Sequence, residues 1–323
     1  MSSKCLFMAV TLPVLIWGIP IMGEKSQAGA GEVGAAEDFD ARWNFDQPDS
    51  TEAVFRTYLS AARASGDADY LAQLLTQIAR TQGLQRKFEE AQATLDEVEP
   101  MLGDTLLVAR VRYLLERGRV FNSSKHPDQA RPLFLAAWEQ GRAAGADFYA
   151  VDAAHMMAIV EPPAESLAWN RRAMEAAEAS TSPRARKWLG SLYNNTGWTY
   201  HDQGDYATAL EMFEKALAFR EEQQQPAEIR IARWCVARTK RSLGQVEEAL
   251  AMQQALKAEF DALGESDGFV FEELGECLLL LGRPEEAAPN FARAYEILSK
   301  DPWLAESEPA RLARLEELGG GGP

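Results

Sequence analysis

The sequence predicts an all-helical protein, a solenoid built from about six helical hairpins. The long interior stretches are rich in Ala, Leu, Glu, Arg and Gln, which favour helix. No alternating strand pattern flanked by Asn-Gly or Asp-Gly turns interrupts them. A motif recurs every 36 to 43 residues, and a repeat array explains how 323 residues fold without one large core, since each unit packs only against its neighbours.

The N-terminal segment, residues 1–30, is typical of an export signal. Lys4 supplies a positive start, Leu6 to Met22 is almost wholly apolar, and Ala28-Gly29-Ala30 offers small residues for cleavage. We therefore expect a periplasmic or secreted protein. Because the apolar run is long for a signal core, an uncleaved membrane anchor remains the alternative. Residues 31–48 are rich in Gly, Ala and acidic residues and are expected to form a flexible acidic linker.

Six turn points define the repeat, at Arg86, Lys125, Glu161, Gly204, Gly244 and Gly282. Seven residues before them stand only small residues, namely Ala79, Gly118, Ala154, Gly197, Ala237 and Gly275. Nine residues after them, three of the six positions are aromatic: Phe134, Phe213 and Phe291. Two helices approach closely only where side chains are small, and a large residue fills the space between such points. The pattern therefore predicts a repeated helical hairpin.

This motif resembles the tetratricopeptide repeat (TPR) family, and most closely its longer variant found in kinesin light chains. The likeness is carried by the segment from Tyr193 to Leu217, YNNTGWTYHDQGDYATALEMFEKAL, and it covers roughly residues 70–298. Asn170 and Gln253 depart from it, because an aromatic residue is usual there, and Glu161-Pro162-Pro163 replaces a glycine turn. The resemblance implies a right-handed superhelical solenoid whose first helices line a concave groove that holds ligands.

Both ends of the array, residues 49–318, are expected to carry capping helices. Asp49 and Glu52 have the spacing of a capping box for a helix through Ala64, which would present Phe55, Leu59 and Ala62 on one face. At the other end Leu312, Leu315 and Leu318 form an apolar stripe. Residues 319–323 are expected to be a disordered tail.

The composition argues against several kinds of function. A net charge of −16 disfavours nucleic acid as the main partner. His126, His155 and His201 are far apart in the chain, and no phosphate loop or nucleophile motif is present. We therefore expect neither an enzyme nor a protein with a metal or cofactor. Cys235 and Cys277 are expected to be small buried apolar side chains, with a disulfide between them as the alternative.

Candidate groove residues follow from the repeat offsets. Six residues before the turns stand Arg80, Arg119, His155, Trp198, Arg238 and Glu276, and Arg241 lies one helical turn after Arg238. If exposed together, these arginines would form a basic stripe that favours an acidic peptide; alternatively they pair with Glu116, Asp152 or Asp202. Asn194 and Asn195 could hold a peptide backbone, or face water or a neighbouring helix end. Trp198 and Trp234 could anchor a ligand side chain, or belong to the core.

These observations predict a scaffold or adaptor that binds a protein or an extended peptide in the groove. A peptide-sensing regulator is the first alternative. Such a regulator needs an output domain, and residues 31–65 are too short for a helix-turn-helix unit, which favours the adaptor. A structural component that self-associates through its end helices is the second alternative. A membrane is expected as a partner only through residues 1–30, if they are not cleaved.

Overall fold

The helices of each hairpin end where the backbone leaves the right-handed helical region. The computed structural model describes residues 38–320 of the chain. Five of the six turn points have the positive φ that ends an α-helix, namely Arg86 (63°), Lys125 (69°), Gly204 (79°), Gly244 (80°) and Gly282 (70°). At the sixth, Glu161 is extended, with φ −84° and ψ 153°, and two prolines follow. Proline disfavours helix at the residue before it, so this turn is made by different means.

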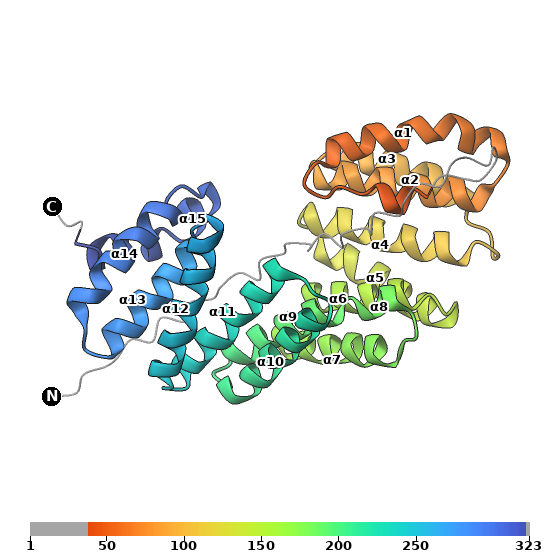
Figure 1. The fold of residues 1–323 in the computed structure, drawn as a ribbon. Coiled ribbons are helices and arrows are strands. Elements are labelled where there is room, and N and C mark those ends of the chain that lie inside the picture. The colour runs from red at the N-terminus through yellow and green to blue at the C-terminus, as the bar shows by residue number, and fades with distance from the viewer. Residues whose placement is uncertain (1–37, 321–323) are drawn as a thin grey trace. The chain divides into compact units, whose positions relative to one another are not determined.

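Each turn joins a first helix, the A helix, to a second helix, the B helix (Figure 1). The A helices are α2 (Ala68–Leu84), α4 (Leu107–Ser123), α6 (Asp147–Val160), α9 (Leu189–Asp202), α11 (Pro226–Ser242) and α13 (Gly268–Leu280). The B helices are α3 (Phe88–Val98), α5 (Pro127–Ala143), α7 (Pro163–Ala179), α10 (Tyr206–Glu222), α12 (Val246–Leu263) and α14 (Pro284–Leu298). The short helices η2 (Glu99–Met101) and α8 (Pro183–Arg186) lie between hairpins. The predicted all-α solenoid of six hairpins is confirmed.

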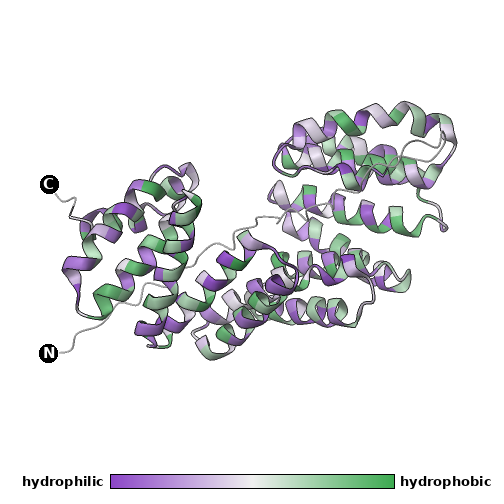
Figure 2. Cartoon of the chain, in the orientation of Figure 1, coloured by the Kyte–Doolittle hydropathy of each residue, from purple (hydrophilic) through white to green (hydrophobic). Residues whose placement is uncertain are grey.

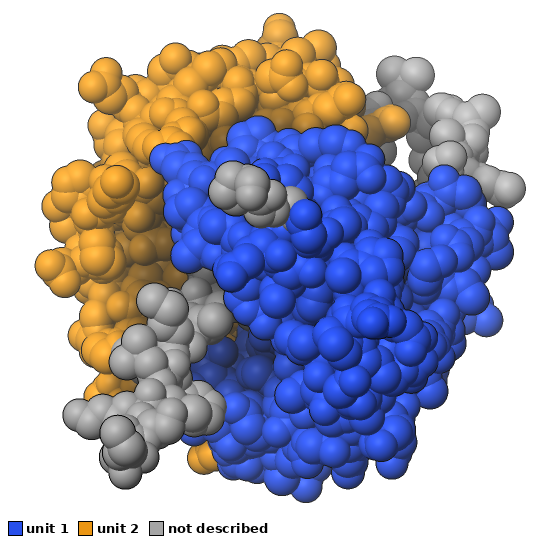
Figure 3. All heavy atoms as spheres, turned by 90° about the vertical axis from the view of Figure 1, so that its left-hand side faces the viewer, with its two compact units in different colours: residues 1–14, 193–323 blue, residues 15–192 orange. Residues whose placement is uncertain are grey.

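The described residues form two compact units (Figure 3). The N-terminal unit comprises residues 38–192 and the C-terminal unit comprises residues 193–320, so the division falls within α9. Hydrophobic and hydrophilic residues alternate along most helices, as expected where one face of each helix is buried (Figure 2).

In three hairpins a phenylalanine of the B helix lies directly against a glycine of the A helix. A Cβ atom on Gly118, Gly197 or Gly275 would lie 2.5, 2.7 or 2.8 Å from the ring of Phe134, Phe213 or Phe291. In the other three hairpins the A helix carries alanine, and the facing B-helix residue is Leu95, Asn170 or Gln253. The small residues and the aromatic residues of the sequence motif are thus two halves of one contact.

Residues 38–47 fold against the first helices, so the expectation of a flexible linker is wrong for this part. Phe39, in the short helix η1 (Phe39–Arg42), is 6% exposed and packs edge-on against Phe55 of α1 (Pro48–Ser65). The ring of Trp43 lies 5.3 Å from that of Phe55. Three aromatic residues among residues 39–45 provide more apolar surface than the segment could leave in water.

The first capping helix also begins differently from the prediction. α1 starts at Pro48, its N-cap residue is Gln47, and no side chain caps it, so the predicted capping box is wrong. Proline suits this first position because the amide it lacks would have had no partner in the helix. Glu52 instead accepts hydrogen bonds from Arg56 and Gln85. The predicted apolar face is confirmed, since Phe55 and Ala62 are buried.

The C-terminal end is covered by α15 (Pro302–Ser307) and α16 (Pro309–Leu318). Leu312 and Leu315 of α16 are buried, as the apolar stripe predicts. Gly319 packs so closely on α14 that a Cβ atom would lie 2.7 Å from the backbone of Ala292. The expected disordered tail is therefore wrong for this residue.

Residues 1–37 and 321–323 lie outside the described residues, and with them the predicted export segment and most of the predicted linker. Among the helices of residues 38–320, none combines the length and the apolar character needed to cross a membrane.

Candidate binding surface

The A helices of each unit face one another through side chains at fixed distances before each turn. We call the residues six, nine, ten and thirteen positions before the turns the A-helix surface. It contains all the predicted site residues apart from Arg241, which lies next to it on α11. Because one repeat is nearly as long as the next, a residue six before one turn lies near the residue nine before the following turn.

In the N-terminal unit this surface carries a series of ion pairs between neighbouring A helices. Arg80 contacts Glu116 at 3.2 Å, and Arg119 contacts the same carboxylate at 2.7 Å. Arg119 also binds Asp152, on α6. Glu116 and Asp152 are 4% and 6% exposed. The arginines therefore do not form an uncompensated basic stripe, and the alternative pairing with Glu116 and Asp152 is the one that the structure has.

Arg112, thirteen residues before its turn, holds the N-terminal segment. Its guanidinium donates to both carboxylate oxygens of Asp40, at 2.7 and 2.9 Å, and to the hydroxyl of Tyr149 at 2.8 Å. Arg112 is only 3% exposed. Burial alone would raise the pKa of Asp40, but Arg112 and Arg184 outweigh it and hold that pKa below its usual value. Sequence reasoning missed Arg112 because it considered only offsets six, nine and ten.

The aromatic residues that follow Asp40 continue along the same surface. The indole Nε1 of Trp43 donates to Oε1 of Gln77, nine residues before the first turn, at 3.0 Å. Phe45 stacks on Trp43 with ring centroids 4.5 Å apart. The guanidinium of Arg80 lies 5.6 Å from the ring of Phe45 and 6.0 Å from that of Trp43. Residues 39–45 thus cover part of the A-helix surface of the N-terminal unit.

His155, a predicted ligand-binding residue, packs against Trp188 with ring centroids 5.2 Å apart. Its Nδ1 atom and Nε1 of Trp188 are buried without a hydrogen-bond partner among the described residues. Burial lowers the pKa of His155 to about 4, with Arg119 acting in the same direction and Asp152 opposing it. The imidazole is therefore neutral at pH 7.

In the C-terminal unit the predicted arginines converge on one carboxylate. Arg238 and Arg241 of α11 both bind Glu273 of α13, and Arg241 does so through Nε at 2.7 Å and Nη2 at 2.9 Å. Glu273 is 1% exposed. Burial alone would raise its pKa, but the two arginines outweigh this and lower it. The pair of arginines is thus neutralised in part by Glu273, whose role the sequence did not reveal.

Three rings follow one another on this surface. Trp198 lies 6.0 Å from Trp234, which lies 6.1 Å from Phe269. Trp198 also packs edge-on against Phe213 in the hairpin core, at 5.1 Å. Both tryptophans are only partly buried, so each belongs to the core on one side and to the surface on the other. Beside them Ile231 is 59% exposed.

The two predicted asparagines lie next to these rings on α9. The amide of Asn194 is used within the protein, since the thiol of Cys235 donates to its Oδ1 at 3.5 Å and its Nδ2 donates to Asn195 at 3.4 Å. The Nδ2 group of Asn195 has no hydrogen-bond partner among residues 38–320. Asn195 is partly exposed and therefore retains two donors for a ligand.

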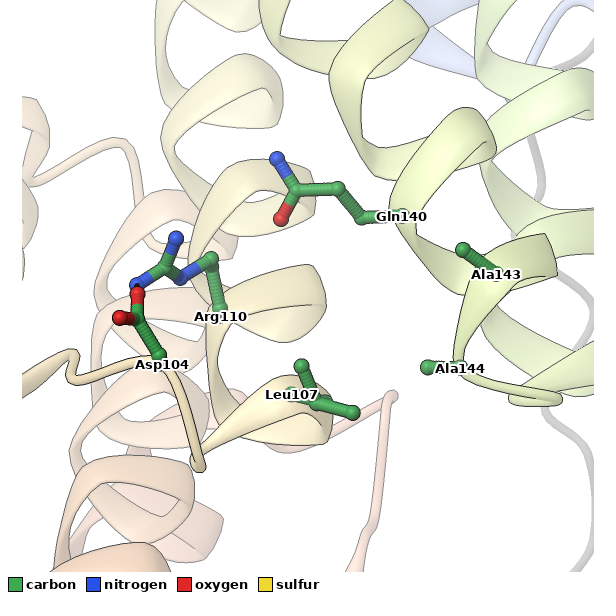
Figure 4. A pocket seen from close by; sticks show the side chains of 6 residues that line it. All are labelled: Asp104, Leu107, Arg110, Gln140, Ala143 and Ala144. Carbon is green, nitrogen blue, oxygen red and sulfur yellow. Dashed lines mark ion pairs between the residues drawn. The ribbon is translucent and has the colours of Figure 1, made fainter.

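A shallow pocket of about 290 Å³ is lined by Asp104, Leu107, Arg110, Gln140, Ala143 and Ala144 (Figure 4). This is at the lower limit for small-molecule sites, and Arg110 is already engaged by the carbonyls of Leu102 and Gly103. No group of three His, Cys, Asp or Glu side chains within residues 38–320 is placed to hold a metal ion. Cys235 and Cys277 are buried thiols that are not joined to each other, as expected.

Residues 150–222, which include most of the third hairpin and the whole fourth hairpin, match the family model described as tetratricopeptide repeat. This segment of the protein carries tetratricopeptide repeats. No curated protein sequence matches the chain.

Three solved structures show the same fold at low sequence identity. The apo form of RapI has 14% identity, covers 85% of this chain and 77% of its own, and has a TM-score of 0.68. The apo quorum sensor NprR from B. thuringiensis has 12% identity, 86% and 81% coverage, and a TM-score of 0.59. A signal transduction ATPase with a TPR sensor from Pyrococcus horikoshii has 16% identity and a TM-score of 0.64. The match covers 84% of this chain but only 42% of that ATPase.

Proposed function

We propose that this TPR protein is a non-enzymatic scaffold that holds an extended peptide of a partner protein on the A-helix surface of its C-terminal unit. The observation that carries the proposal is the combination of the Asn195 amide, which keeps two donors, with the partly exposed rings of Trp198 and Trp234. An amide can hold a peptide backbone without reading its side chains, while rings provide apolar anchors.

Two further points support a peptide as the ligand. Ile231 exposes an apolar side chain beside the rings, which suits a side chain of the peptide. NprR, whose fold is similar, has also been solved in complex with its cognate peptide NprX, at 12% identity and a TM-score of 0.51. A preference of this surface for acidic peptides is not part of the proposal, because Glu273 already binds Arg238 and Arg241.

A photo-crosslinking amino acid at position 231 tests this proposal. We expect the partner to be captured there, and not from position 263 on the B helix α12, where Leu263 is similarly exposed at 52%. Asn195→Ala should leave the thermal melt unchanged and weaken capture, because it removes about 0.5–1.5 kcal/mol of hydrogen bonding. Equal capture from positions 231 and 263, or capture unaffected by both Asn195→Ala and Trp234→Ala, would place the partner elsewhere.

We also propose that the scaffold acts outside the cytoplasm after cleavage near Ala30. Lys4 and the apolar run from Leu6 to Met22 support this. Removal of residues 1–30 takes away Lys4, Lys25 and Glu24, so the net charge changes from −16 to −17 and 293 residues remain. An intact mass of the exported protein checks this, and a mass that retains residues 1–30 would favour the membrane anchor.

A further inference from the structure

The A-helix surface of the N-terminal unit already contains a bound peptide, which is the chain's own segment of residues 39–45. The carboxylate of Asp40 is held by both Nη atoms of Arg112, and Arg184 contributes a third contact at 3.3 Å. Trp43 and Phe45 stack on each other and lie under Arg80. These contacts involve side chains from α2, α4 and α8, so a short stretch of chain is recognised by several repeats together.

The carboxylate site is more elaborate than an end cap requires. Apolar packing of Phe39 on Phe55 would suffice to cover the first helices. Arg112 nevertheless presents its guanidinium in the fork geometry that matches a carboxylate, and the Tyr149 hydroxyl and the Gln73 amide oxygen orient it. A buried arginine needs a partner anion, because an unpaired charge in this position would be costly. The site therefore selects a carboxylate at one position of its ligand.

The occupant is partly open to solvent, as a displaceable segment must be. It makes side-chain contacts with the A helices, and its backbone is hydrogen-bonded to α1 at Asn44: the amide of Asn44 donates to Thr51 at 3.2 Å, and the Thr51 hydroxyl donates to the carbonyl of Asn44 at 2.9 Å. Asp40 retains 23% exposure of its side chain, and Arg42 is exposed. Release of residues 38–43 would keep the hydrogen bonds between Asn44 and Thr51 of α1, and it would give up the ring contacts of Phe39 and Trp43 with Phe55.

We propose that the A-helix surface around Arg112 is a second peptide-binding site, which takes a protein segment with an aspartate followed by aromatic residues, and that residues 39–45 occupy it as an internal ligand. A partner segment with the same chemistry binds by displacing them. Because the internal ligand is tethered, only the fraction of molecules with the site open can bind, and the apparent affinity falls by that fraction. This site lies in the other unit from the one in the proposed function, so either can fail alone.

A labelled peptide with the sequence of residues 38–46 tests the proposal by fluorescence anisotropy on the full chain. We expect the variant Asp40→Asn, Trp43→Ala, which weakens the internal ligand, to bind the peptide at least about tenfold more tightly than the wild type. Asp46→Asn makes the same charge change on an exposed side chain of the same segment and should match the wild type. Binding should weaken as salt rises.

The carboxylate contact is tested from both sides. A peptide with asparagine in place of the aspartate that corresponds to Asp40 should bind the opened variant at least about tenfold less well. Adding Arg112→Gln to the opened protein should weaken binding of the unchanged peptide by the same factor. The substituted peptide requires no change in the protein, so it remains decisive if the Arg112 variant misfolds. Equal binding of the peptide to wild-type and opened protein, or equal binding of both peptides, overturns the proposal.

Two other readouts complete the test. Trypsin should cleave after Arg42 faster in the opened variant, and also in the wild type when the peptide is in excess, because displacement exposes the segment. Unchanged cleavage in the presence of saturating peptide would show that the peptide binds without displacing the segment, contrary to the proposal. A wild-type dimer that becomes a monomer on Asp40→Asn would also contradict the internal ligand, by assigning the segment to a second copy of the chain.

Discussion

The two units carry similar hairpins but different A-helix surfaces. In the N-terminal unit the arginines bind carboxylates from neighbouring A helices and from residue 40, and aromatic residues of the preceding segment cover them. In the C-terminal unit two arginines share the single carboxylate of Glu273, and the aromatic rings belong to the A helices themselves and remain partly exposed. The same scaffold thus presents one surface that is occupied and one that is open.

The largest expected effect tests whether the cores of the two units are equivalent. Phe134→Ala in the N-terminal unit and Phe213→Ala in the C-terminal unit each remove a fully buried ring and should each cost about 3–5 kcal/mol of the free energy of unfolding. Hydrogen exchange, which reports the stability of each unit separately, measures both. A loss in only one unit would mean that the hairpins differ in their cores as well as their surfaces.

The glycine opposite each ring provides a control for this comparison. Gly197→Ala should destabilise the C-terminal unit, because the new Cβ atom meets Phe213 at 2.7 Å. Combining it with Phe213→Leu recreates the pair that the first hairpin has in Ala79 and Leu95. The double variant should therefore be more stable than the sum of the two single changes predicts.

The next effect distinguishes the two sets of ion pairs. Glu273→Gln removes the carboxylate that Arg238 and Arg241 share and should cost about 2–4 kcal/mol. Glu116→Gln in the N-terminal unit should cost less, about 1–2 kcal/mol, because Arg119 keeps Asp152. Urea denaturation with hydrogen exchange compares them. Equal losses would show that the second carboxylate, Asp152, gives the N-terminal unit no advantage.

Acid should weaken the N-terminal unit through His155. Its pKa is about 4 in the folded protein and 6.5 in its ordinary state, so the unfolded chain binds a proton that the folded chain does not. Stability is therefore complete above pH 6.5 and declines as pH falls towards 4, by about 1–2 kcal/mol at pH 5. In His155→Gln the melting temperature should depend less on pH, whereas His126→Gln, on an exposed turn, is the control for the loss of an imidazole.

The smallest effect concerns a turn. Lys125 has a φ of 69°, which is strained for a residue with a side chain, so Lys125→Gly should stabilise the second hairpin by about 0.5–1 kcal/mol. Glu161→Gly, at the turn with a negative φ, should instead destabilise the third hairpin, since glycine adds conformational freedom to the unfolded chain and the ion pair of Glu161 with Arg131 is lost. Thermal melts of both variants would show opposite shifts; shifts of the same sign would contradict the strain argument.

The repeat register could be predicted because its determinants are local. The packing of two adjacent helices fixes a small residue seven positions before each turn and, in three hairpins, an aromatic residue nine positions after it. The turns at Arg86 and Lys125 can therefore be located although neither residue is glycine. The sequence also allowed the alternative in which Arg80 and Arg119 pair with Glu116, since the repeat places these positions next to each other on successive A helices.

The contact between Arg112 and Asp40 could not be predicted in the same way. The two residues are 72 positions apart, and their meeting depends on the path of residues 38–47 outside the repeat pattern. The composition of residues 38–47 gave one indication that this segment is packed, because Phe39, Trp43 and Phe45 are too apolar for a solvent-exposed linker. The sharing of Glu273 was missed because it depends on side-chain directions that a repeat offset leaves undetermined.

The contact between glycine and phenylalanine constrains how such an array can change by recombination between its own repeats. A crossover at a turn would join the A helix of one hairpin to the B helix of another. The A helix with Ala79 would then face a ring such as Phe134, which gives a steric clash. Alternatively, the A helix with Gly118 would face Leu95, which leaves a cavity. Crossovers between hairpins preserve every contact of this kind, so whole hairpins are the units that can be duplicated, deleted or exchanged.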